Sequence, residues 1–188
     1  MNKLHELMAD IDDRIAKRTL RGRVGLLGTL EREHHELDCI LLSVLERARD
    51  HQDGDTILAR QRLFSRLKVA LRSHTRAEEQ ALYELVRQKD AAREAAAHCS
   101  GSHRQIEHLL RRLESIGESE ARWLSTLATL QMKVAEHIKE EEEVFFDLAS
   151  LVLGEAVLLA IETAYASERL RMEAMLGQPS RKRLDAFA

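Results

Sequence analysis

Several histidines in this chain are followed four residues later by a carboxylate, a spacing that suits metal binding. Five such pairs occur, whereas nine histidines and 32 acidic residues among 188 would give about one or two by chance. Residues four apart share one face of a helix, so an imidazole and a carboxylate at this spacing can reach the same ion. The pair His51/Asp55 spans Gly54 in a predicted loop and is set aside. Four pairs remain: His34/Asp38, His74/Glu78, His103/Glu107 and His137/Glu141.

These histidines fall on the apolar stripe of their segments and not on a solvated face. Around His74, steps of three and four residues pass through Phe64, Leu67, Leu71, His74, Glu78, Leu82 and Leu85. Around His137 they pass through Leu127, Leu130, Val134, His137, Glu141, Phe145 and Leu148. His34 and His103 likewise lie between apolar residues. Burying an unpaired charge costs on the order of several kcal/mol, so this core pattern favours bound cations.

The elements that must position these residues are long helices, because the chain has one proline, eight glycines and 4% aromatic residues. The periodicity predicts helices over 2–20, 29–49, 55–88, 91–116, 119–150 and 155–176. Turn signals near residue 54, at Lys89–Asp90 and at 117–119 lie midway between successive histidines. An all-α, up-down-up-down antiparallel four-helix bundle would therefore bring the four histidines to one level.

A length of 188 residues with 44% apolar content suits a single domain. Its expected parts are an N-terminal helix within 1–24, the four-helix bundle over 25–150, a C-terminal helix within 151–176 and a polar tail over 177–188. The bundle contains an internal repeat, since His34-x-x-Leu37 matches His103-x-x-Ile106 and each is followed by His-x-x-x-Glu-Glu, at 74–79 and 137–142. This repeat predicts two helix pairs with pseudo-two-fold symmetry, which favours a two-metal centre.

Charge and composition exclude several classes of partner. The net charge is −3, so no overall positive field attracts nucleic acid. The first residues are too charged for a secretory signal, and the most apolar stretch, 151–161, is too short to span a membrane. Cys39 and Cys99 give no disulfide framework, which suits a reducing compartment. We therefore expect a cytoplasmic protein that binds neither nucleic acid nor membrane.

Over roughly residues 25–175 the chain resembles bacterial hemerythrin-like proteins, the hemerythrin HHE cation-binding family. The resemblance rests on four motifs: Glu33-His34-His35-Glu36-Leu37, His74-Thr75-Arg76-Ala77-Glu78-Glu79 with Leu82-Tyr83, Ser102-His103-Arg104-Gln105-Ile106, and His137-Ile138-Lys139-Glu140-Glu141-Glu142 with Val144-Phe145-Phe146. It implies a four-helix bundle that holds two non-haem iron ions joined by an oxo or hydroxo bridge and by two carboxylates. By this resemblance the histidines His34, His74, His103 and His137 are terminal ligands, and Glu78 and Glu141 are the bridges.

The chain departs from the oxygen-carrying hemerythrins at two ligand positions. Those proteins have a histidine where this chain has Glu107, which we interpret as a seventh ligand or as an acceptor for an imidazole N–H. Their fourth-helix bridge lies five residues after the histidine, so Glu142 competes with Glu141 for that role. The extra carboxylate is a hard ligand that stabilises ferric iron and equally suits manganese or zinc. This ligand set disfavours reversible oxygen carriage.

The leading hypothesis is a cytoplasmic di-iron protein that senses or handles oxygen, peroxide, nitric oxide or iron, with no catalytic residue assigned. One alternative is a ferritin-like di-iron oxidase, which needs two Glu-x-x-His motifs where this chain offers only Glu31/His34. Another is a metal-free helical interaction module. The stripe Leu4, Met8, Ile11 and Ile15 suits one partner helix, in its own bundle or in a homodimer.

Overall fold

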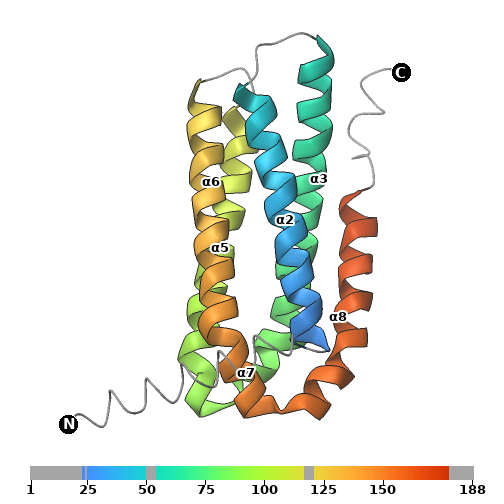
Figure 1. The fold of residues 1–188 in the computed structure, drawn as a ribbon, viewed down its shortest axis with the longest axis vertical. Helices are drawn as coiled ribbons and strands as arrows, with labels where there is room; N and C mark the ends of the chain where they lie inside the picture. Colours follow the sequence, from blue (N-terminus) through green and yellow to red (C-terminus); the bar gives the residue numbers. More distant parts are fainter. Residues whose placement is uncertain (1–22, 24, 50–53, 117–120, 178–188) are drawn as a thin grey trace, which may run out of the picture.

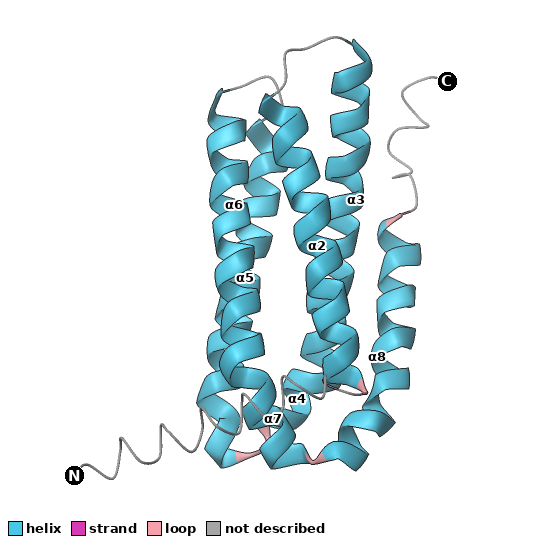
Figure 2. Ribbon diagram, in the orientation of Figure 1, coloured by secondary structure: helices cyan, strands magenta, loops and turns pink. Residues whose placement is uncertain are grey.

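The computed structural model describes residues 23, 25–49, 54–116 and 121–177, which are helical apart from short turns (Figure 2). The long helices are α2 (Leu26–Arg49), α3 (Gly54–Glu78), α5 (Arg93–Ile116), α6 (Ala121–Glu140) and α8 (Glu155–Leu176). Shorter elements are η1 (Glu79–Tyr83), α4 (Glu84–Arg87), η2 (Asp90–Ala92), η3 (Glu141–Phe145) and α7 (Phe146–Leu153). No strand occurs within these ranges, so the prediction of an all-helical fold is confirmed. The predicted N-terminal helix and polar tail lie outside the described residues, apart from Gly177.

The helices α2, α3, α5 and α6 lie side by side as a bundle (Figure 1). Helix α2 contacts α3 and α6, while α5 contacts α6 and, less extensively, α3. Helix α2 begins three residues earlier than predicted, at Leu26, and the helical run that begins with α6 continues to Leu153 instead of residue 150. These differences are of the size expected at helix ends, because the apolar stripe marks the middle of a helix better than its ends.

The core consists of two hydrophobic clusters with a polar layer between them. One cluster is centred on Leu30, Tyr83 and Phe146, and the other contains Leu41, Trp123 and residues near them. In each of the four helices the histidine lies between residues of one cluster and residues of the other. The apolar stripes therefore bury a layer of ionisable groups inside the bundle.

Helix α8 returns along the outside of the bundle and packs against α3, α2 and η1 (Figure 1). The reversal occurs at Gly154, whose φ of 78° lies in the region that glycine adopts readily and other residues rarely do. The helical runs before and after it are bent by 111° relative to each other. This turn places α8 beside the histidine of α3.

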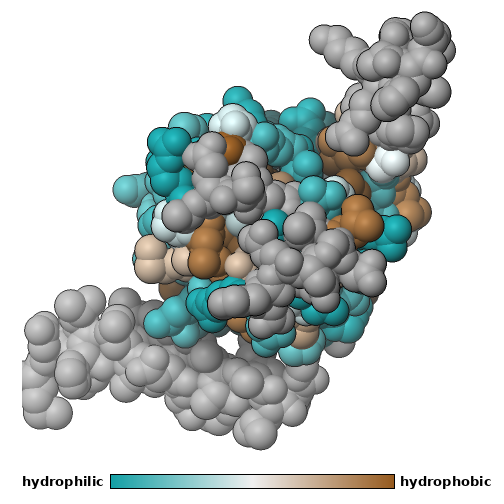
Figure 3. Space-filling view, turned by 90° about the horizontal axis from the view of Figure 1, so that it is seen from above, coloured by the Kyte–Doolittle hydropathy of each residue, from teal (hydrophilic) through white to brown (hydrophobic). Residues whose placement is uncertain are grey.

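Seen from above, the coloured surface has hydrophilic side chains around much of its edge and hydrophobic patches near its middle and on one side (Figure 3). Among the described residues, no individual helix has both the length and the apolar character needed to cross a membrane. One bent pair, Arg122–Leu153 with Glu155–Leu176, meets the criterion only when its two helices are taken together.

Candidate metal centre

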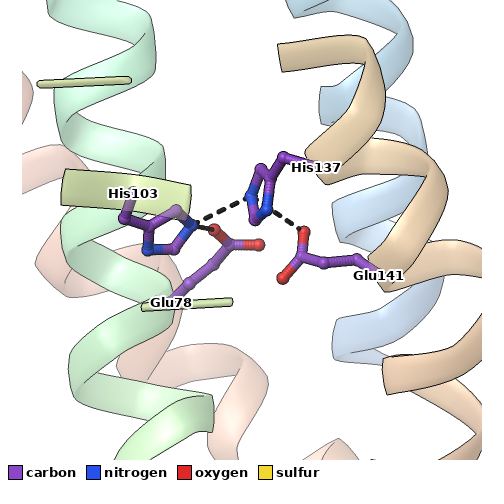
Figure 4. A group of neighbouring side chains, drawn as sticks. All are labelled: Glu78, His103, His137 and Glu141. Atoms are coloured by element: carbon purple, nitrogen blue, oxygen red, sulfur yellow. Dashed lines mark hydrogen bonds and ion pairs between the residues drawn. The ribbon is translucent and has the colours of Figure 1, made fainter. Parts of the chain in front are cut away.

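Six of the seven predicted ligands meet in the polar layer. Their side chains are at most 7% exposed: His34, His74, Glu78, His103, His137 and Glu141. They form two groups whose ligand atoms lie within 4.8 Å of one another, His34 with His74 and Glu78, and His103 with His137, Glu78 and Glu141. Figure 4 shows the second group pointing inward from α3, α5, α6 and η3. Each helix pair of the sequence repeat thus supplies the two histidines of one group.

Glu78 belongs to both groups. Its Oε1 lies 3.3 Å from His74 Nε2 and 3.9 Å from His34 Nε2. Its Oε2 lies 3.3 Å from His103 Nε2, in the other helix pair. The two oxygens of one carboxylate therefore face histidines on opposite sides, as a bridge between two ions requires.

Glu141 makes a similar link in the opposite direction. Its Oε2 lies 3.3 Å from His137 Nε2 and 3.2 Å from His34 Nε2. The other oxygen accepts a hydrogen bond from the hydroxyl of Tyr83. Two carboxylates, one from each half of the repeat, thus lie between the two pairs of histidines.

The donor set fits metal ions by a physical test. Of the eight buried side-chain atoms without a hydrogen-bond partner among the described residues, five face one another in this layer: His34 Nε2, His74 Nε2, both carboxylate oxygens of Glu78, and Glu141 Oε2. They converge on one another, although an unpartnered buried polar atom costs about 1–3 kcal/mol and more if charged. A buried cluster of imidazole nitrogens and carboxylate oxygens is the donor set that a cation binds, with any proton on an imidazole displaced.

The charges in the layer depend on one another. Burial would raise the pKa of Glu78, but the imidazoles of His74, His103 and His34 outweigh burial and hold the pKa well below its ordinary value. Burial would likewise lower the pKa of His103, but the neighbouring carboxylates of Glu78 and Glu79 raise it to about 9. The metal-free centre therefore keeps its carboxylates ionised and holds protons on some of its imidazoles.

The imidazole rings of His103 and His137 contact each other through their Nε2 atoms. Their Nε2 atoms are 3.0 Å apart, close enough for a hydrogen bond with one ring as the donor. Burial lowers the pKa of His137, while carboxylate hydrogen bonds raise that of His103 above burial's opposing effect. In the metal-free protein one of these rings must donate to the other, and a metal ion must displace that proton to bind both rings.

Three further carboxylates orient the histidines from outside. Glu142 Oε1 accepts from Nδ1 of His34 at 2.8 Å. Glu33 Oε2 is 3.0 Å from Nδ1 of His74, and Glu79 Oε1 is 3.1 Å from Nδ1 of His103. These contacts place the hydrogen on Nδ1 and leave Nε2 as the atom that faces the centre. His137 Nδ1 has no such partner among the described residues.

The structure separates the roles of the two competing glutamates of α6 and η3. Glu141 is buried in the layer, whereas Glu142 is about one-third exposed and reaches His34 from the outer side. Four residues after His137 is the position that faces the centre, and five residues after it is the position that faces the neighbouring helix α2. Sequence reasoning missed Glu33 and Glu79, although the Glu-Glu doublets at 78–79 and 141–142 were a signal for the outer carboxylates.

Glu107, predicted as a seventh ligand, is not brought to the centre. Its carboxylate accepts hydrogen bonds from Arg72 at 2.9 and 3.2 Å and pairs with Arg111 at 3.1 Å. The four-residue spacing is the same as in His74/Glu78 and His137/Glu141, so spacing alone does not distinguish Glu107. Its ion pairs with Arg72 and Arg111 hold the carboxylate outside the polar layer.

Two aromatic rings cover the centre at equivalent positions of the repeat. Tyr83 stacks on His103 with ring centroids 5.1 Å apart and an interplanar angle of 5°. Phe146 stacks on His34 at 5.7 Å and 12°. Tyr83 is the last residue of the π-helical segment η1, which begins just after Glu78, and Phe146 directly follows η3, which begins at Glu141. Such wide turns are frequent at functional sites, and the sequence had not predicted them.

Helix α8 adds a second contact to His74. The Tyr165 hydroxyl lies 3.0 Å from His74 Nδ1 and donates a hydrogen bond to Glu33. Arg169 forms an ion pair with the same Glu33 carboxylate. Tyr165 is fully buried. The sequence had not indicated this contact, because Tyr165 and His74 are 91 residues apart.

The family profile named Hemerythrin HHE cation binding domain matches residues 25–149. This match spans most of the chain, and it covers all six residues of the polar layer. The chain belongs to the hemerythrin HHE cation-binding domain family. Comparisons with curated proteins and with solved structures gave no match. The buried histidine and glutamate groups are compatible with the cation binding that defines the family.

Proposed function

We propose that this protein binds two metal ions, as a non-haem di-iron centre within an antiparallel four-helix bundle. One ion is held by His34 and His74, and the other by His103 and His137. Glu78 and Glu141 bridge them. The observation that carries this proposal is that Glu78 places one oxygen against each pair of histidines.

The outer residues support this assignment. Nδ1–H groups fixed by Glu33, Glu79 and Glu142 leave the Nε2 atoms of three histidines free to bind. The rings of Tyr83 and Phe146 limit access of water to the layer. Bound iron would supply an open coordination position and a redox couple for a small diatomic or peroxidic ligand. We infer that the protein senses or handles such a ligand, or iron itself, in the cytoplasm.

Histidines outnumber the bridging carboxylates in the centre, which suits iron, while zinc and manganese accept the same donors. A ferritin-like oxidase is disfavoured because Glu31, the glutamate of its single Glu-x-x-His candidate, pairs with Arg23 outside the layer. The polar layer also argues against a metal-free interaction module, which has no need for five unpartnered buried atoms.

The test is elemental analysis of the purified protein after anaerobic iron loading. We expect about two irons per chain in the natural protein. The control variant Glu107→Gln should also bind about two, because Glu107 lies four residues after a histidine, as Glu78 does, but outside the layer. Glu78→Gln removes the shared bridge but keeps its shape, and should bind less than one iron. Natural protein without bound metal, or Glu78→Gln with full occupancy, would contradict the proposal.

A further inference from the structure

A second polar site lies beside the metal centre, in a pocket of about 820 Å³ between α3, α5 and the end of α8. Five arginines line it: Arg72, Arg76, Arg87, Arg104 and Arg111. The lining also includes the hydroxyl-bearing Thr75 and Ser100, and two carboxylates, Glu79 and Glu107. Its volume is within the range of small-molecule sites.

The carboxylates of the pocket do not neutralise all of its arginines. Glu107 pairs with Arg72 and Arg111, which it holds in place. Arg76 and Arg104 form no ion pair with any described carboxylate. Arg76 donates one hydrogen bond to the side-chain oxygen of Gln80, and its charge acts on Glu168. Neither Arg76 nor Arg104 is closed off by an ion pair, so both guanidinium groups keep further N–H donors for an anion that enters the pocket.

The floor of the pocket is connected to the metal centre. His103 is part of the lining. Glu79 accepts from Nδ1 of His103 through Oε1, and its Oε2 is held by Arg87 at 3.1 Å and by Ser100 at 3.0 Å. An anion that competes with Glu79 for Arg87 would change the hydrogen bond between Glu79 and Nδ1 of His103.

We propose that this pocket binds a phosphorylated small molecule, and that its occupancy is transmitted to the metal centre through Arg87, Glu79 and His103. Guanidinium groups bind phosphate in a forked, two-hydrogen-bond geometry, and several of them in one pocket select a ligand with more than one anionic group. The binding site stands on its own geometry. Its transmission to a metal ion rests on the proposed function.

The binding test is isothermal titration calorimetry with fructose 1,6-bisphosphate, in parallel with unphosphorylated fructose at the same ionic strength. We expect saturable binding of one bisphosphate per chain and none of fructose. The double variant Arg76→Gln/Arg104→Gln should bind roughly a hundredfold more weakly, about tenfold for each charged hydrogen-bond donor lost. The control Arg112→Gln, on α5 and outside the pocket, should bind as the natural protein does.

Metal analysis of the double variant checks that it retains the centre. No saturable heat from the natural protein, or equal binding by the double variant, would overturn the proposal. The transmission is tested by the absorption spectrum of the iron-loaded protein, which should change on adding the bisphosphate but not in the double variant. Binding without any spectral change would overturn the transmission. Calorimetry needs no bound iron, so bisphosphate binding can be tested even if the protein binds no metal. A failure of the metal proposal is therefore distinguishable from a failure of the pocket proposal.

Discussion

Tyr165 and His74 lie on helices outside and inside the bundle, with the phenol oxygen 3.0 Å from the imidazole Nδ1. Helix α8, which carries Tyr165, follows the segment that matches the family profile, residues 25–149. The centre therefore includes a contact from beyond the family domain. Tyr165 donates a hydrogen bond to Glu33, and Arg169 pairs with the same carboxylate. The Tyr165 hydroxyl and the Glu33 carboxylate together fix the orientation of the His74 imidazole.

Replacing Tyr165 by phenylalanine should weaken metal binding while keeping the ring. Loss of the hydroxyl removes one partner of His74 Nδ1 and one hydrogen bond to Glu33. Outer partners of this kind change metal affinity by about 10–100-fold. The measurement is competition with a chelator of known affinity. Equal chelator resistance in Tyr165→Phe and the natural protein would show that α8 only packs on the bundle.

Changing Tyr83 to phenylalanine should destabilise the metal-free protein more than the metal-loaded one. The Tyr83 hydroxyl donates to Glu141, a fully buried carboxylate that metal would otherwise satisfy. We expect a loss of about 1–3 kcal/mol in the free energy of unfolding without metal and a smaller loss with it. Chemical denaturation of both forms checks this. Equal losses in the two forms would contradict it.

Much of this centre could be predicted from the sequence, because a histidine and a glutamate four residues apart on an apolar stripe leave few alternatives. The outer partners could not. Glu33 and Glu79 lie beside the stripe, and their role depends on which helix packs next to them. Tyr165 reaches His74 only because Gly154 reverses the chain. Glu107 shares the spacing of Glu78, but Arg72 holds it away from the layer.

Removing the metal should lower the thermal midpoint of unfolding. Without a cation, five buried atoms that face one another in the layer lack hydrogen-bond partners, and metal that binds only the folded chain adds its binding free energy to stability. Calorimetric melting before and after chelation, followed by reloading, measures the difference. Glu107→Gln should show the same difference as the natural protein, whereas in Glu78→Gln it should be much smaller.

The metal-free protein should lose stability as pH rises from about 6.5 to 9. The folded-state pKa of His103 is raised to about 9 by its carboxylate neighbours, against the opposing effect of burial. A raised pKa contributes stability that is complete below the unfolded value of 6.5 and is lost as pH rises through the folded value. Denaturation of the chelated protein across this range is the measurement, and a flat profile would contradict it.

Metal binding should show the opposite trend with pH. Metal competes with the protons on His103 and His34. The pKa of His34 is also raised well above its ordinary value, because the neighbouring carboxylates outweigh burial. Affinity should therefore increase from pH 6.5 toward 9, with protons released on binding. Titration calorimetry in buffers of different ionisation enthalpy counts those protons, and zero release at pH 7 would count against protonated imidazoles.

The two halves of the repeat differ at one position that touches the centre. Tyr83 ends one π-helical segment, Phe146 directly follows the other, and each ring stacks on a histidine, but only Tyr83 carries a hydroxyl. That hydroxyl lies 3.5 Å from His103 Nε2, on the inner side of the ring. The pseudo-symmetric scaffold therefore encloses two inequivalent positions, one beside a phenol hydroxyl and the other beside a hydrocarbon ring. Two identical ions placed there would differ in acidity and in reactivity.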